Sequence, residues 1–220
     1  MRKFLRASLS CALACGIGII ASGASAQDVN ITQDLPFFEF DNGQRFIVIE
    51  RNQDNEAVID PSFAKTSRPC PPFCIHPMSA GPGVDTYGEL EIMSFLEDKV
   101  ATGRGYLVDA RLRNWYDAGT IPGSVNLPFT LFEGDEQNPF LDGILQLLGG
   151  KPNAEGKWDF SEAKELALFC NGPWCDQSPR AIRKLLEAGY PPSKLKYYRG
   201  GMQNWLLLGL TVEIPGAPGG

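Results

Sequence analysis

The chain has 220 residues, of which 43% are hydrophobic and 21% are charged, and this is the composition of a globular protein with a buried core. The length suits one domain with extensions better than two full domains. The formal net charge of −6 argues against a nucleic-acid-binding protein, because each phosphate contact needs a cation that displaces counterions.

The N-terminal segment, residues 1–26, has the pattern of a secretory signal peptide. Three basic residues lie among the first six, residues 9–20 are mostly apolar, and the small residues 24–26 precede a polar pair. We expect cleavage after Ala26, export to the periplasm or the medium, and no stable membrane span in the mature chain. A membrane anchor is the alternative, but the apolar run is short for a bilayer span. Cleavage would remove three positive charges and take the net charge from −6 to −9.

Residues 27–83 are expected to form an N-terminal extension. Two strand-like segments, 35–40 and 44–50, flank an Asp-Asn-Gly triplet that favours a tight turn, so we predict a β-hairpin. The stretch 60–83 is rich in proline and contains the segment Cys70-Pro71-Pro72-Phe73-Cys74. We expect this stretch to wrap on the domain, because its apolar residues and its cysteine pair favour docking over a free linker.

The main domain, residues 84–216, is predicted to alternate short apolar strands with helices. A first helix is expected to begin at Thr86, which with Glu89 forms a capping box, and to end at Gly103 and Gly105. Strands are expected at 106–109, 124–127, 166–169 and 196–198, and helices at 115–118, 140–148, 179–188 and 202–208. This alternation predicts an α/β fold with a parallel sheet covered by helices on both faces.

Cys170 is the candidate reactive residue, because it directly follows the apolar strand 166–169. In open α/β sheets, ligands bind beyond the carboxyl ends of the strands, where a loop can aim its N–H groups at an anion. The positive end of the helix that follows would favour the thiolate over the thiol. From position alone, a buried and inert cysteine is an equal alternative.

Three stretches, in the same order along the chain, resemble the characteristic motifs of rhodanese-like domains. The first joins Asp109-Ala110-Arg111 to Gly119-Thr120-Ile121-Pro122-Gly123-Ser124, the second is the loop from Cys170 into a helix, and the third is the segment 200–205 with its Gly-Gly-x-x-x-Trp pattern. The resemblance covers residues 84–214 and implies the parallel α/β sheet of that family.

The resemblance also implies a sulfurtransferase in which Cys170 carries sulfane sulfur as a persulfide. The sulfur would come from a small sulfur-containing anion such as thiosulfate, or from a protein thiol or persulfide. Asp109 and Arg111 would support the loop. The predicted active-site loop comprises Asn171, Gly172, Pro173, Trp174, Cys175, Asp176, Gln177 and Ser178, with Arg180 as the nearest cation. The loop lacks the basic residue that thiosulfate-using members often carry, and Thr120 replaces a usual histidine, which weakens thiosulfate as the substrate.

The sequence alone does not decide how the cysteines pair. Cys170 and Cys175 lie five apart across a Gly-Pro turn, so they could form a static disulfide, act as a resolving redox pair, or remain independent thiols. Cys70 and Cys74 are expected to form a local disulfide. With His76, the only histidine, the cysteines could also converge on a metal, but their spacing is not diagnostic and we assign no metal.

Three functions therefore compete. The first is an exported sulfurtransferase that uses Cys170, and the second is a thiol–disulfide redox protein that uses Cys170 and Cys175. The third is a binding module that has kept the fold and lost catalysis, with a protein partner docked through the extension 27–83. No cofactor is expected, because the chain has no Gly-x-Gly-x-x-Gly loop, phosphate-binding Gly-Lys-Ser/Thr or Cys-x-x-Cys-His motif.

Overall fold

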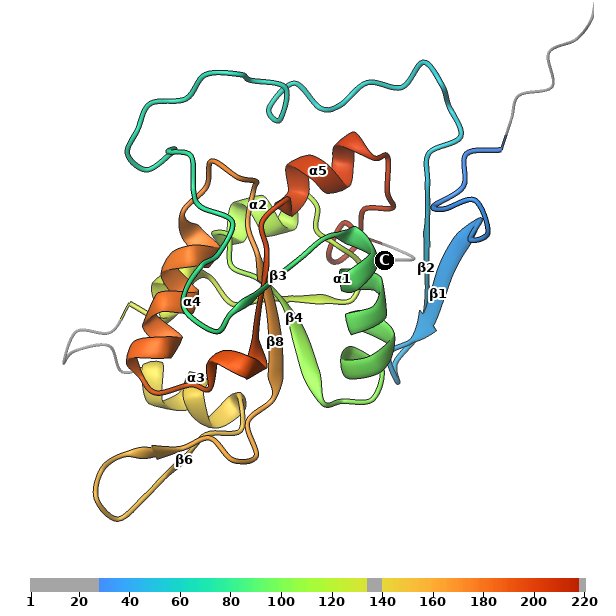
Figure 1. Cartoon of the computed structure of the whole chain (residues 1–220). Helices are drawn as coiled ribbons and strands as arrows, with labels where there is room; N and C mark the ends of the chain where they lie inside the picture. The colour runs from blue at the N-terminus through green and yellow to red at the C-terminus, as the bar shows by residue number, and fades with distance from the viewer. Residues whose placement is uncertain (1–27, 134–139, 218–220) are drawn as a thin grey trace, which may run out of the picture.

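A five-stranded sheet forms the centre of the protein (Figure 1), as seen in a computed structural model that describes residues 28–133 and 140–217. Its strands lie in the order β3, β9, β8, β4 and β5, and every neighbouring pair is parallel. The strand bounds are β3 (Asp85–Tyr87), β4 (Gly105–Asp109), β5 (Ser124–Asn126), β8 (Glu165–Phe169) and β9 (Leu195–Tyr198). The predicted signal peptide, residues 1–26, lies outside the described residues. Within the described part, no helix is long and apolar enough to cross a membrane.

Helices cover both faces of this sheet, so the predicted fold class is confirmed. On one face lie α1 (Glu89–Phe95), which continues into a π-helical turn (Leu96–Val100), and α5 (Gly201–Leu207). The other face packs against α3 (Leu141–Leu147) and α4 (Gln177–Glu187). The shorter elements are α2 (Arg113–Asp117), the 3₁₀ turns Phe129–Leu131 and Pro192–Lys194, and the small ribbon of β6 (Lys151–Pro152) and β7 (Trp158–Asp159).

The apolar sequence of β8 explains why it is the central strand. Its side chains alternate between the two faces: Leu166 and Leu168 join the core under α3 and α4, and Phe169 joins the core under α1 and α5. All three side chains are fully buried. A strand that is buried on both faces needs a continuous apolar run, because any polar side chain would be removed from water.

An antiparallel hairpin adds a layer outside α1, as predicted from the Asp-Asn-Gly triplet. Its strands are β1 (Phe37–Asp41) and β2 (Phe46–Glu50), and alternate residues of both are buried. The turn places Gly43 at a φ of 83°, which explains the need for glycine there. The inward-facing residues, Phe38, Phe40, Ile47 and Ile49, join the core that α1 and α5 share.

The predicted start of the first helix is wrong. Thr86 lies inside β3, where it pairs with Tyr197 of β9, so its backbone is extended rather than poised to cap a helix. The helix is capped two residues later, at Gly88, whose N–H donates to the Glu91 carboxylate at 2.9 Å. Gly105 was also expected to end this helix, but it opens β4 instead.

The proline-rich segment 60–83, here called the strap, runs from the hairpin side to β3 across the end of the sheet where β4 and β8 finish (Figure 1). It docks on the domain, as expected from its composition. Phe63 is buried in the core beside Trp115, with 6.0 Å between the ring centroids. The Gln203 amide donates to the Phe63 carbonyl at 2.7 Å, and the Thr86 hydroxyl donates to the Met78 carbonyl. The strap is therefore part of the folded domain.

Candidate active site

Cys170 lies directly beyond the carboxyl end of β8, at the start of a loop that we call the cysteine loop (residues 170–178). The start of α5 holds this loop: the N–H of Met202 donates to the Cys170 carbonyl at 3.0 Å, and that of Gln203 donates to the Asn171 carbonyl at 2.9 Å. Only glycine permits this approach, because a Cβ at Gly201 would lie 2.3 Å from the Cys170 carbonyl oxygen. The Gly-Gly pair of the third motif thus positions the loop.

Two oxygen atoms lie close to the Cys170 sulfur. The Ser178 hydroxyl, in the first turn of α4, donates a hydrogen bond to Cys170 Sγ at 3.1 Å. The Cys175 carbonyl oxygen lies 3.3 Å from the same sulfur, and it can accept the proton of the thiol form. Cys170 is 2% exposed, so the sulfur sits beneath its loop rather than on the surface.

The hydrogen bonds at Cys170 favour its thiolate. Burial raises the pKa of Cys170, but hydrogen bonds from the Cys175 thiol, the Ser178 hydroxyl and the N–H groups of Ser178 and Gly172 outweigh burial and lower the pKa to about 7. Donation to Cys170 and burial raise the pKa of Cys175 well above its ordinary value. One thiol of the pair is thus a nucleophile at neutral pH, and the other keeps its proton.

Both loop cysteines are free thiols in this structure, so the static bridge, one of the three alternatives left open by the sequence, is not present. The interaction with the Cys175 thiol instead lowers the pKa of Cys170. Cys70 and Cys74 form the expected disulfide, with 4.9 Å between their Cα atoms. This bond removes both sulfurs as thiolate ligands, and with them the metal site considered from sequence.

Asp109 and Arg111 form a buried ion pair under the loop, where their side chains are 0% and 1% exposed. The guanidinium binds the carboxylate through two of its nitrogens at 2.6–3.1 Å and also donates to the Gly119 carbonyl at 2.6 Å. It reaches Asn171 Oδ1 at 3.4 Å, which links the pair to the cysteine loop. The Thr120 hydroxyl donates to Asp109 at 2.8 Å. These contacts fit a supporting role for the pair.

Arg180 lies at the loop, but it does not extend toward the sulfur. Its guanidinium forms an ion pair with Glu133 and a longer one, at 3.7 Å, with Asp176. It also lies 4.6 Å from the centroid of the Phe129 ring. These partners hold the side chain between α4 and the segment 129–133, which sequence reasoning could not anticipate because Glu133 lies far from Arg180 in the chain.

Trp174, at the tip of the loop, is covered by the strap. Its Nε1 donates to Gln203 at 2.8 Å, the Arg68 guanidinium carbon lies 3.8 Å from the indole centroid, and the Phe73 ring centroid lies 5.4 Å away. Sequence reasoning missed Arg68 and Gln203. Gln203 lies within the Gly-Gly-x-x-x-Trp motif, which was the available signal for it, whereas nothing in the sequence marked Arg68.

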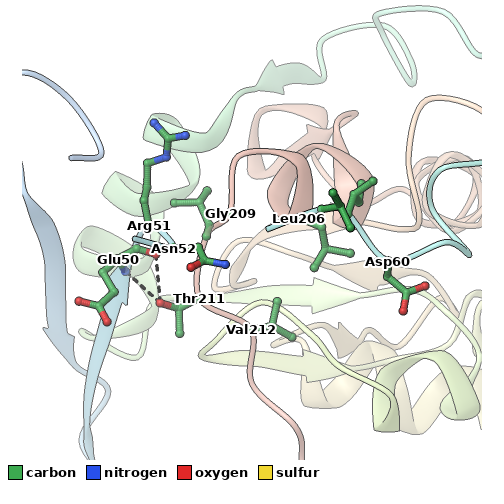
Figure 2. A pocket seen from close by; sticks show the side chains of 11 residues that line it. Glu50, Arg51, Asn52, Asp60, Leu206, Gly209, Thr211 and Val212 are labelled. Carbon is green, nitrogen blue, oxygen red and sulfur yellow. Dashed lines mark hydrogen bonds between the residues drawn. The ribbon is translucent and has the colours of Figure 1, made fainter. Parts of the chain in front are cut away.

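One open pocket lies away from the cysteine loop. It has a volume of about 360 Å³ and lies between the start of the strap and the segment that follows α5 (Figure 2). None of its lining residues belongs to the cysteine loop. A smaller cavity of about 190 Å³ lies closer, beside Phe63, Arg111 and Met202.

Comparison with known proteins places the chain in a family. The model of the family described as Rhodanese-like domain matches residues 92–208. An HTH-type transcriptional regulator of Mycobacterium tuberculosis is 30% identical over 118 residues, which are 54% of this chain, and the match spans 41% of the regulator.

Among solved structures, a thiosulfate sulfurtransferase from Pseudomonas aeruginosa is 21% identical with a TM-score of 0.41, over 62% of this chain and 21% of that one. A human single-domain sulfurtransferase is 25% identical with a TM-score of 0.34, over 58% of this chain and 97% of that one. Since the family match covers more than half of the 220 residues, and includes the cysteine loop and the Gly-Gly-x-x-x-Trp segment, this chain belongs to the rhodanese-like family.

Proposed function

We propose that the protein is a sulfurtransferase that carries sulfane sulfur as a persulfide on Cys170. The observation that supports this most directly is the position of the Cys170 thiol beyond the end of the central strand, where the Ser178 hydroxyl donates a hydrogen bond to its sulfur at 3.1 Å. Hydrogen bonding there lowers the pKa of Cys170 to about 7. A thiol that is substantially ionised at neutral pH is a strong nucleophile toward divalent sulfur.

The proposed reaction has two displacement steps. The Cys170 thiolate attacks the outer sulfur of a donor persulfide or thiosulfate and forms a new S–S bond. The bond between that sulfur and the rest of the donor breaks, and the leaving thiolate or sulfite takes the electron pair. An acceptor thiolate then attacks the outer sulfur of the Cys170 persulfide, forms the acceptor persulfide and returns Cys170 as a thiolate.

The charges around the loop support a persulfide donor over thiosulfate. Thiosulfate carries two negative charges, and its binding needs a cation directed at the loop. The arginines near the loop have other partners: Arg111 pairs with Asp109, Arg180 pairs with Glu133, Arg199 donates to the His76 carbonyl, and Arg68 stacks on Trp174 and donates to the Ser62 carbonyl. Asp176 adds a negative charge at the loop itself, which further disfavours a dianion.

Mass spectrometry tests the proposal directly. The protein is incubated with glutathione persulfide or with thiosulfate, and the Cys170 peptide is examined for the addition of one sulfur atom. We expect the addition with the persulfide, its loss in Cys170→Ser, and its transfer to a small thiol. Absence of any sulfur on Cys170 with both donors would overturn the proposal.

The Cys170–Cys175 pair supports a second function, that of a thiol–disulfide redox protein. Both thiols are free, and the Cys170 sulfur lies 3.3 Å from the Cys175 carbonyl oxygen, so the two residues are in direct contact. A peroxide would oxidise Cys170 to a sulfenic acid, and Cys175 would displace water from it to form a disulfide. Mild peroxide should then consume two thiols reversibly in the wild type, whereas Cys175→Ser should leave a trappable sulfenic acid. If peroxide leaves both thiols intact in the wild type, this second function fails.

Export remains part of the proposal. The basic, apolar and small-residue order of residues 1–26 supports it, and a disulfide such as Cys70–Cys74 fits an oxidising compartment. N-terminal sequencing of the protein from an exporting bacterial host should show a chain that starts at Gln27. The suggested role of the extension in binding a protein partner also stays a prediction.

A further inference from the structure

The strap closes over the outer side of the cysteine loop through backbone contacts. The N–H of His76 donates to the Pro173 carbonyl at 3.0 Å. The guanidinium of Arg199, which follows β9, donates to the His76 carbonyl at 3.1 and 2.8 Å. His76 is therefore held between the cysteine loop and the end of the neighbouring strand.

The disulfide of the strap presents an aromatic side chain to the loop. Phe73 lies inside the small ring that the Cys70–Cys74 bond closes, and its ring contacts Trp174. Arg68 completes the stack, since its guanidinium carbon lies 3.8 Å from the indole centroid and 5.8 Å from the Phe73 centroid. Because the ring is short, the disulfide restricts the backbone of Phe73 and favours this stacked arrangement.

The interface under the strap is incompletely satisfied. Among the described residues, four buried side-chain atoms have no hydrogen-bond partner, and they are Arg68 Nε, His76 Nε2, Gln177 Oε1 and Tyr197 Oη. Two belong to the strap itself, and Gln177 lies in the cysteine loop. Unpaired buried donors and acceptors disfavour the state that buries them. Lifting the strap would return Arg68 and His76 to water, which makes an open state accessible.

The strap has an exposed stretch, residues 64–67, between the buried Phe63 and Arg68. The part of the strap beyond Phe63 can therefore hinge at this stretch while Phe63 stays in the core. Cys70 is exposed to solvent, whereas Cys74 is half-buried, so Cys70 is the more accessible of the two residues to a thiol from outside.

We propose that the strap is a redox-released cover on Cys170, opened when a partner dithiol reduces the Cys70–Cys74 disulfide. This inference rests on the proposed role of Cys170 as the reactive residue. A partner thiolate attacks the Cys70 sulfur, forms a mixed disulfide and releases Cys74 as a thiolate, which takes up a proton. The second partner thiol displaces Cys70 as a thiol, and the partner leaves oxidised to a disulfide. Phe73 is then no longer held on Trp174, and a donor gains access to Cys170.

The test measures how fast iodoacetamide alkylates Cys170, by mass spectrometry of its peptide, so it needs no sulfur transfer. Three forms are compared with the oxidised wild type: the double variant Cys70→Ser/Cys74→Ser, the double variant Arg68→Ala/Phe73→Ala with its disulfide intact, and the wild type reduced with a dithiol. We expect alkylation about tenfold faster in all three, the size of effect that loss of one cation–π and one aromatic contact produces.

The matched control is Arg113→Ala/Phe46→Ala, which removes the same side-chain types from exposed positions away from the strap and should alkylate at the wild-type rate. An unchanged rate in both the serine variant and the reduced wild type would overturn the redox control. An unchanged rate in Arg68→Ala/Phe73→Ala would overturn the cover itself. If alkylation is faster in the three forms but none of them accepts sulfur, the proposed function fails and this inference stands. If all forms are alkylated at the same slow rate but transfer sulfur normally, this inference fails and the proposed function stands.

Discussion

The Ser178 hydroxyl lies 3.1 Å from Cys170 Sγ and donates a hydrogen bond to it, although the two residues are eight positions apart. They meet because the cysteine loop returns over the end of β8 and enters α4, whose first turn carries Ser178. The same turn directs the positive end of the α4 dipole toward the loop. The sulfur thus lies where one helix start supplies both a donor and a favourable field for a thiolate.

The first prediction concerns pH. Hydrogen bonds lower the pKa of Cys170 to about 7, so the residue is protonated and unreactive below this value and anionic above it. The alkylation rate of Cys170 should therefore rise with pH and reach half of its maximum near pH 7. Cys175 keeps its proton throughout this range and adds nothing to the profile. A midpoint near the ordinary cysteine value would contradict the assignment.

The second prediction removes the hydroxyl donor. A hydrogen bond to a charged group contributes about 1.5–3 kcal/mol, so Ser178→Ala should raise the pKa of Cys170 and slow its alkylation at neutral pH by about tenfold. Alkylation at high pH should be much less affected, because the thiolate forms there in both proteins. The control is Ser94→Ala, at an exposed position of α1, which should leave the midpoint unchanged. An unshifted midpoint in Ser178→Ala would mean that the hydroxyl does not stabilise the thiolate.

The third prediction compares two ion pairs that differ in burial. Asp109 and Arg111 are almost fully buried, so Asp109→Ala leaves an unpaired guanidinium in the interior and should lower the free energy of unfolding by about 3–5 kcal/mol. The Arg113–Asp117 pair has side chains that are 72% and 47% exposed. Asp117→Ala should lower the free energy of unfolding by less than about 1 kcal/mol. Urea unfolding measures both, and equal losses would show that the buried pair does not support the domain.

The fourth prediction uses two glycines with similar backbones. Gly103 has a φ of 66° and Gly201 a φ of 56°, but only at Gly201 would a Cβ meet neighbouring atoms, the closest at 2.3 Å. Gly103→Ala should lower the free energy of unfolding by about 1–2 kcal/mol, because alanine is strained at a positive φ. Gly201→Ala should cost clearly more and also reduce the reactivity of Cys170, because the new methyl group displaces the loop. Urea unfolding and Cys170 alkylation check this together; wild-type alkylation in a folded Gly201→Ala protein would contradict it.

Much of the fold was predictable because its elements are marked by local patterns. The apolar run that ends at Phe169 and the turn triplet before Gln44 each determine a local backbone preference. The start of the first helix was not predictable, since the extended backbone of Thr86 depends on pairing with Tyr197, more than a hundred residues away. Local capping propensity was overridden there by a sheet contact.

In the candidate site too, local patterns predicted some features, whereas others depend on contacts between distant segments. Cys170 and Asp109 both end apolar strands, and parallel strands end at the same edge of a sheet, so their proximity followed from sequence. The partner of Arg180 was not predictable, because its pairing with Glu133 joins two segments whose contact no local pattern contains.

The sequence by itself therefore determined the parallel α/β sheet, the hairpin, the position of Cys170 at a strand end and the local Cys70–Cys74 pair, all of which depend on short-range patterns. Only the tertiary structure decided that Cys175 remains a free thiol in a residue that contacts Cys170, that Ser178 binds the sulfur, and that the strap lies on Trp174. These features depend on where separate segments meet in space, and burial together with hydrogen bonding, which set the pKa of Cys170, exists only once they have met.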